Sequence, residues 1–74
     1  MRRIHWGPDL LDRLERAIDE AQRIRITRRG TEYVILPHAL RSEGATEVIV
    51  AVHPNTGDEM RFRLDEIEEF SVIS

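Results

Sequence analysis

One stretch of the chain, residues 46–70, constrains the fold more than any other because it combines several signals in a fixed order. Val48–Val52 is apolar at every position, which is typical of a strand covered on both faces, here by a barrel interior and by a helix. His53–Asp58 holds a proline, an asparagine and a glycine, which favour a tight turn. In Glu59–Leu64 apolar residues alternate with arginines, so one side of a second strand faces a core. The stretch predicts an antiparallel hairpin, and Leu64–Ile67 predicts a single 3-10 turn after it.

The first half of the chain predicts a helix that packs against this hairpin. Apolar residues recur at steps of three and four, as on one face of an amphipathic helix, at Leu10, Leu11, Leu14, Ala17, Ile18 and Ala21. The other positions carry charges of mixed sign, which is typical of a solvated face. Asp9 precedes the pattern and is a favourable N-cap residue. We therefore expect a helix over residues 10–22.

After residue 22 the hydrophobic period changes to that of strands. Residues 23–27 alternate between arginine or threonine and isoleucine, and residues 28–31 have the composition of a turn. Residues 32–36 are rich in strand-forming side chains. Pro37 cannot donate to a ladder, so we expect it to end this strand, with residues 38–45 as a connection.

A short strand over residues 70–73 completes the prediction. The fold class is α+β and mainly β: an N-terminal helix followed by a five-stranded, partly open antiparallel barrel. At 74 residues the chain is one small domain, which we place at residues 9–74, after an extension at residues 1–8. A domain of this size buries roughly 60% of the surface that its unfolded chain exposes. Its free energy of unfolding is expected to be about 4–11 kcal/mol.

The composition limits the environment and the chemistry. The chain has no cysteine, which excludes disulfides and thiolate metal sites. Small secreted domains usually carry disulfides, so a cytoplasmic location is expected. No apolar run approaches the ~20 residues that span a bilayer, so no membrane association is expected.

Arginine is the only strongly basic residue type, and its distribution is uneven. Arginine forms bidentate contacts with phosphates and carboxylates, but a GC-rich genome also favours it, and both explanations stay open. Residues 1–41 hold nine arginines and six acidic residues, a balance of +3, whereas residues 42–74 hold two arginines and eight acidic residues, a balance of −6. The asymmetry indicates either a basic face with an acidic tail or a pairing of the two halves, within or between subunits.

The chain resembles the WYL domain family over about residues 10–73. The resemblance is carried by Leu14, Ala17 and Ile18 in the helix, by Arg23–Ile26, by Leu36, Pro37 and Leu40, by Val50 and Ala51, and by Arg61–Ile67. It implies a helix leading into an Sm-like five-stranded barrel. The Trp-Tyr-Leu signature of the family would fall at Glu47, Val48 and Ile49, so the signature itself is missing. One motif arginine is matched by Arg61, and Glu66 stands where the family has another.

The resemblance also implies a function. WYL domains usually follow a DNA-binding helix-turn-helix in bacterial regulators, and they are thought to sense ligands, including nucleic acids and nucleotide-like molecules. No helix-turn-helix is predicted within these 74 residues. A module of this kind acts on a partner, belongs to a longer chain, or is a stand-alone relative.

Four arginines are the candidate binding residues: Arg23, Arg25, Arg61 and Arg63. Each pair alternates outward from its strand, so the four side chains are expected to form one basic face. Such a face would bind phosphates, which supply most non-specific affinity for nucleic acid. The alternative is a solvated surface on which these arginines pair with acidic residues. The chain has four aromatic residues, fewer than a single-strand binder usually places along a basic groove.

Catalytic and metal chemistry have little support in the sequence. His5, His38 and His53 do not stand at a metal-ligand spacing, and the serines lie in loops unrelated to them. The acidic residues 65–69 lack the glycine and asparagine spacing of a calcium loop. We therefore predict a protein that is not an enzyme, with no catalytic residue, no metal site and no cofactor.

Two functions of different class follow. The first is a regulatory or sensing module that binds a nucleic acid or nucleotide-like ligand through the arginine face. The second is a protein-interaction or self-assembling small barrel without a nucleic-acid ligand, in which an edge strand or the acidic residues 65–69 contact the partner. Charge asymmetry between the two halves would favour a head-to-tail contact.

Overall fold

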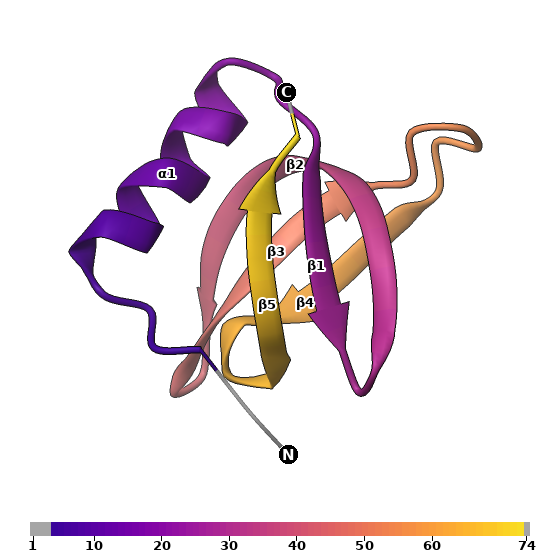
Figure 1. Cartoon of the computed structure of the whole chain (residues 1–74). Helices are drawn as coiled ribbons and strands as arrows, with labels where there is room; N and C mark the ends of the chain where they lie inside the picture. The colour runs from indigo at the N-terminus through magenta and orange to yellow at the C-terminus, as the bar shows by residue number, and fades with distance from the viewer. Residues whose placement is uncertain (1–3, 74) are drawn as a thin grey trace.

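The computed structural model describes residues 4–73 and shows one helix followed by five strands (Figure 1). The elements are α1 (Pro8–Asp19), β1 (Ile24–Arg28), β2 (Thr31–Glu43), β3 (Thr46–Val52), β4 (Glu59–Arg63), the 3-10 turn η1 (Leu64–Glu66) and β5 (Ile67–Val72). Residues 1–3 of the expected extension and Ser74 lie outside the described residues.

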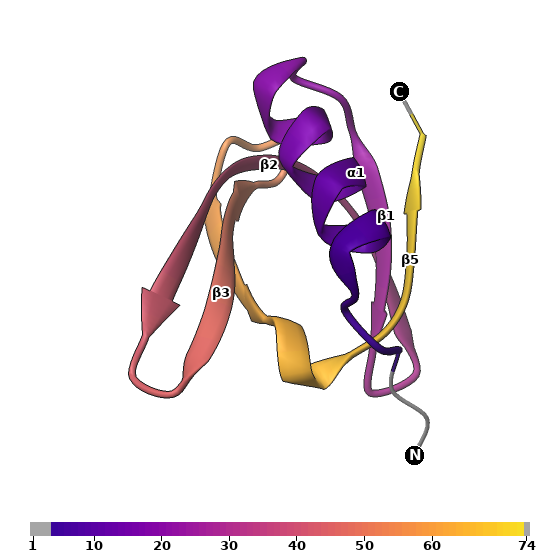
Figure 2. The ribbon, with the colours of Figure 1, turned by 90° about the vertical axis from the view of Figure 1, so that its left-hand side faces the viewer.

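The five strands form one antiparallel sheet in the order β4-β3-β2-β1-β5. The sheet curves strongly, as Figure 2 shows. Its two outermost strands, β4 and β5, do not pair with each other within residues 4–73, so the sheet is not closed into a barrel. The predicted fold class, a helix and a mainly β, partly open five-stranded antiparallel structure, is confirmed.

The helix begins earlier than expected. Gly7 is the N-cap residue and Pro8 occupies the first turn, where the missing N–H of proline costs nothing. The prediction of Asp9 as the N-cap is wrong, and Asp9 instead lies in the first turn, where its charge favours the helix dipole. Leu14 and Ala17 are fully buried in the core. The helix lies across the mouth of the curved sheet and contacts β2 and β5 (Figure 2).

β2 is much longer than predicted. Pro37 does not end it: the strand continues to Glu43, and only Gly44 and Ala45 connect it to β3. Pro37 is opposite Ala51, and the register shifts between Pro37 and Ala39. A bulge tolerates a residue without an N–H, which explains a fully buried proline inside a strand.

The core lies between the concave face of the sheet and the helix. It contains Leu14, Ala17, Ile24, Ile26, Ile35, Ile49, Ala51, Phe62, Leu64 and Ile67. Along β4 the burial alternates as predicted, with Phe62 buried and Arg61 and Arg63 exposed. β3 is largely covered on both faces, but α1 contacts β2 and β5, so the expected helix over its second face is wrong.

The residues before the helix are attached to the sheet. The indole Nε1 of Trp6 donates a hydrogen bond to the carbonyl of Leu64 at 3.0 Å. The Trp6 ring lies 5.2 Å from the Phe70 ring, and the Ile4 N–H donates to the carbonyl of Ile67 at 3.4 Å. We call residues 4–7 the N-terminal segment. It lies beside η1 and β5.

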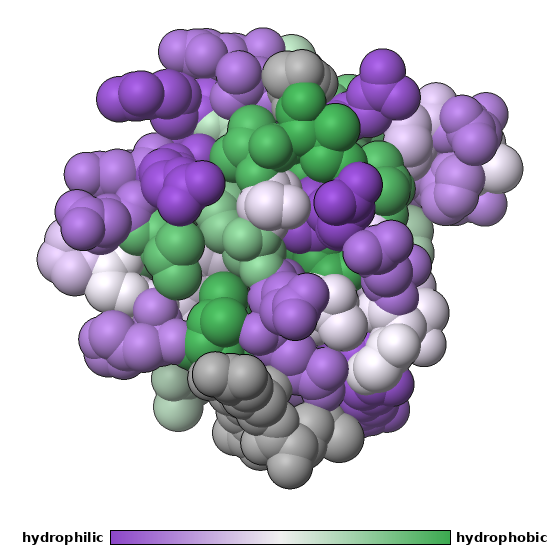
Figure 3. Space-filling view, viewed as in Figure 1, coloured by the Kyte–Doolittle hydropathy of each residue, from purple (hydrophilic) through white to green (hydrophobic). Residues whose placement is uncertain are grey.

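The face shown in Figure 3 is mostly polar, with some hydrophobic side chains between the polar ones. Val34 and Ile73 are the large hydrophobic residues most exposed among those described, at 37% and 39%. Green side chains in Figure 3 gather near the C-terminal end of β5. No helix in residues 4–73 has the length and apolar character needed to cross a membrane.

Candidate functional site

The structure places the four predicted arginines in two groups. Arg23 and Arg25 lie before and on β1, whereas Arg61 and Arg63 lie on β4. β2 and β3 separate β1 from β4, so the two groups are three interstrand steps apart, about 14 Å along the sheet. All four side chains are exposed on the convex face, but the structure does not bring them into one patch.

The β1 group lies beside a polar hollow. The Arg25 Nε lies 3.5 Å from a carboxylate oxygen of Glu32, and both side chains are about half exposed. The hollow is also lined by Thr27, Glu69 and Ser71. The predicted binding role of Arg23 and Arg25 stays a prediction.

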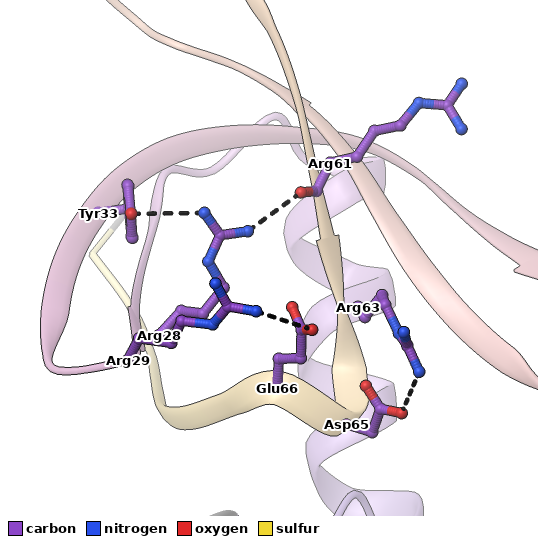
Figure 4. A network of polar contacts seen from close by, with 7 residues as sticks. All are labelled: Arg28, Arg29, Tyr33, Arg61, Arg63, Asp65 and Glu66. Atoms are coloured by element: carbon purple, nitrogen blue, oxygen red, sulfur yellow. Dashed lines mark hydrogen bonds and ion pairs between the residues drawn. The ribbon is translucent and has the colours of Figure 1, made fainter.

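The β4 group is held by carboxylates. Arg61 pairs with Glu43, and its Nε lies 3.3 Å from Glu59. The Arg63 Nη2 lies 2.8 Å from an oxygen of Asp65, and this hydrogen bond raises the pKa of Arg63 above its usual value (Figure 4). These pairs are exposed, and exposed ion pairs are weak because water screens them, so a phosphate can replace the carboxylate at little cost.

The structure also places Arg28 next to the β4 group, although the sequence predicted this residue in a turn. Its guanidinium donates to the Arg61 carbonyl at 3.5 Å and to the Tyr33 hydroxyl at 3.4 Å. It lies 4.6 Å from the centre of the Phe62 ring and 5.2 Å from that of Tyr33. Arg28 is half-buried, and it makes no ion pair with any residue between 4 and 73.

Arg29 lies next to it, at the turn between β1 and β2. Its Nη2 lies 3.6 Å from a carboxylate oxygen of Glu66, and its φ is 52°, in the left-handed region. The N–H of Gly30 donates to Glu68 at 3.3 Å, which also ties this turn to β5. Figure 4 shows Arg28 and Arg29 approaching β4 and η1 from β1.

We define the arginine cluster as Arg28, Arg29, Arg61 and Arg63, of which Arg29 and Arg63 pair with Glu66 and Asp65 of η1 (Figure 4). The guanidinium of Arg28 and the main-chain carbonyl of Arg61 face each other, while the Arg61 side chain points away from η1. The guanidinium groups of Arg29 and Arg63 therefore lie beside η1, that of Arg28 lies against β4, and that of Arg61 points away from the turn (Figure 4).

The sequence contained a signal that Arg28 lies on the inward side of its strand. Ile24 and Ile26 are both fully buried, and Arg28 follows at the same spacing of two. A strand that continues one residue further places Arg28 on the inward side. The inward position of Arg28 was not predicted, because Arg28, Arg29 and Gly30 together have the composition of a turn.

The described residues offer no obvious catalytic or metal-binding arrangement. Within residues 4–73 no three His, Cys, Asp or Glu side chains gather so that they could hold a metal ion. His53 accepts a hydrogen bond from the Asn55 N–H at 3.2 Å, which is a local turn contact. The chemistry that the arginine cluster offers is the binding of anions.

Comparisons with known proteins agree with this architecture. No curated protein matches the chain significantly. Proteasome accessory factor B/C (PafBC) of Arthrobacter aurescens has a similar fold, with a TM-score of 0.75 and 21% identity over 97% of this chain. The chain spans 13% of the length of that protein. The WYL domain model matches residues 9–72, so the chain belongs to the WYL domain family.

Proposed function

We propose that this WYL domain is a non-enzymatic regulatory or sensing module that binds the phosphates of a nucleic acid or nucleotide-like ligand at the arginine cluster. Membership of the WYL family supports the regulatory or sensing role. The arginine cluster supports the choice of an anionic ligand. We also propose a cytoplasmic location, on the ground that the chain has no cysteine.

The observation that carries the proposal is the environment of Arg28. Its contacts are a main-chain carbonyl, a phenolic hydroxyl and two aromatic rings, all of them neutral. A half-buried cation is costly unless it is paired, because burial removes part of its hydration. The rings hold the guanidinium in place without neutralising it. A phosphate oxygen would supply the missing charge and accept charge-assisted hydrogen bonds.

The neighbouring arginines extend the site. Arg29, Arg61 and Arg63 have exposed side chains whose carboxylate partners a phosphate can displace. Each arginine that contacts a phosphate releases counterions, which drives binding at low salt. Arg23 and Arg25 form a second group on the convex face, and we propose that a longer strand reaches them as well.

Fluorescence anisotropy with short labelled single-stranded DNA and RNA, at low and physiological salt, tests the proposal. The double variant Arg61→Glu, Arg63→Glu should lose binding, and Arg23→Glu, Arg25→Glu tests the second group separately. The matched control is Arg13→Glu, Arg16→Glu, which makes the same change of charge on the exposed face of α1. Equal losses of affinity in Arg61→Glu, Arg63→Glu and in this control would show only a general effect of net charge. That result would contradict the arginine cluster as the binding site.

A second candidate function is assembly through the sheet edges. β4 and β5 each have a strand partner on one side only within residues 4–73. Arg61 and Arg63 on β4 and Glu68 and Glu69 on β5 are of opposite charge, so a head-to-tail strand pairing between two copies would be complementary. Light scattering over a range of protein and salt concentrations tests it, and a mass that stays monomeric throughout would contradict it.

A further inference from the structure

The η1 turn contacts the arginine cluster through its side chains. The carboxylate of Asp65 lies 2.8 Å from Arg63, and that of Glu66 lies 3.6 Å from Arg29 (Figure 4). These two adjacent acidic residues therefore hold one arginine from β4 and one from the turn after β1. Whatever binds the arginines competes directly with the side chains of η1.

The main chain of the same corner holds the N-terminal segment. The carbonyl of Leu64 accepts the indole hydrogen bond of Trp6 at 3.0 Å, and the carbonyl of Ile67 accepts the Ile4 N–H at 3.4 Å. The Leu64 carbonyl belongs to the peptide group that immediately precedes Asp65. A change in the backbone of Asp65 therefore reorients the acceptor of the Trp6 hydrogen bond.

We propose that η1 couples the arginine cluster to the N-terminal segment, so that the two ion pairs of Asp65 and Glu66 determine how firmly Trp6 is held. The biological trigger rests on the proposed function, because a phosphate ligand is the agent that would take Arg63 and Arg29 from their carboxylates. The coupling itself is a property of the unliganded domain.

The direction of the coupling follows from charge. When a phosphate takes the two arginines, Asp65 and Glu66 lose their partners and face a new negative charge. Like charges at a few ångströms repel one another, so the turn moves away from the ligand. Leu64 and Ile67 are buried on either side, at 6% and 0% exposure, so the movement falls on the peptide groups of the turn. The Trp6 hydrogen bond then weakens. By thermodynamic linkage, ligand binding and the hydrogen bond of Trp6 each disfavour the other.

Trp6 provides the measurement because it is the only tryptophan of the chain. The double variant Asp65→Asn, Glu66→Gln should shift the Trp6 emission to longer wavelength and raise its quenching by acrylamide, without any ligand. The matched control is Glu43→Gln, Glu59→Gln, which also removes two acidic charges and releases Arg61 but does not touch η1. Circular dichroism and thermal melts show that both variants are folded. Unchanged Trp6 emission and quenching in the folded double variant overturns the coupling.

The reciprocal experiment uses Trp6→Phe, which keeps an aromatic ring near Phe70 and removes the hydrogen bond to Leu64. Its dissociation constant for a labelled oligonucleotide, measured by anisotropy, should fall about fivefold, at the low end of typical coupling factors. An oligonucleotide that binds the unaltered domain and Trp6→Phe equally overturns the coupling but leaves the proposed function intact. If no oligonucleotide binds, the proposed function fails, and the emission of the Asp65 and Glu66 variant still decides the coupling.

Discussion

The guanidinium of Arg28 donates a hydrogen bond to the main-chain carbonyl of Arg61, 3.5 Å away, and thereby joins β1 to β4. These strands are not neighbours in the sheet, and β4 has only β3 as a strand partner within residues 4–73. An edge strand leaves main-chain groups without a ladder partner. Arg28 supplies one such partner, and the same side chain is the least compensated positive charge of the arginine cluster.

Replacing Arg28 therefore has two expected effects. Arg28→Met keeps much of the length of the side chain and removes its charge, so we expect most of the oligonucleotide affinity to be lost. The free energy of unfolding should fall by only about 1 kcal/mol: hydrogen bonds of about 0.5–1.5 kcal/mol and cation–π contacts of about 0.5–2 kcal/mol are lost, but removing an unpaired, half-buried charge offsets part of the loss. Anisotropy and urea unfolding measure the two effects. Arg28→Lys is the control that keeps the charge, and affinity that survives Arg28→Met unchanged would remove Arg28 from the site.

The salt dependence of binding counts the phosphate contacts. For single strands the slope of log affinity against log salt is about −0.7 per contact, so four arginines predict a slope of about −3. Arg61→Gln, Arg63→Gln should reduce its magnitude by about 1.4, the amount for two contacts. Anisotropy titrations at several salt concentrations measure the slope. A slope near zero would show that phosphates do not drive binding.

Removing a competing carboxylate should strengthen binding. Glu43 pairs with Arg61 from the end of β2, so Glu43→Gln removes one of the two carboxylates that compete with a ligand for that arginine. We expect a tighter dissociation constant with a change in unfolding free energy below about 1 kcal/mol, because the pair is exposed. Glu15→Gln on the exposed face of α1 is the control for the same change of net charge. Equal gains in both variants would mean that net charge alone, not Arg61, sets the affinity.

The helix should be essential for stability. Leu14 is fully buried against the sheet, and Leu→Ala changes in a core cost about 2–5 kcal/mol. This loss is a large share of an unfolding free energy of about 4–11 kcal/mol, and at the lower end of that range it leaves a substantial unfolded fraction. Leu10→Ala, at a half-buried position one turn earlier, should cost less. Urea unfolding followed by circular dichroism compares them, and equal effects would contradict the packing of Leu14 described above.

The fold was predictable where the signals were local and agreed with one another. The apolar run at residues 48–52, the turn after it and the alternation along β4 all correspond to the structure. The extent of β2 was not predictable, because whether Pro37 ends a strand depends on its partner. Opposite Ala51 the ladder shifts register, and no donor is required of the proline.

The candidate site was predictable only in part, for a related reason. Arg61 and Arg63 were found from their alternation with buried residues of the same strand. Whether these two arginines lie near Arg23 and Arg25 depends on the order of the strands in the sheet. The alternation within a single strand does not determine that order. Arg28 reaches β4 and Arg29 reaches η1 because the sheet curves, and the curvature is a property of the whole sheet (Figure 2).

β2 belongs to two half-sheets. Its residues Thr31–Ile35 pair with β1, and those from Leu36 to Glu43 pair with β3. Within residues 4–73 no ladder joins β1 or β5 to β3 or β4. The boundary between Ile35 and Leu36 therefore divides two three-stranded sheets that share one strand. A small rotation at this boundary would change the distance between β1 and β4, which the side chain of Arg28 joins.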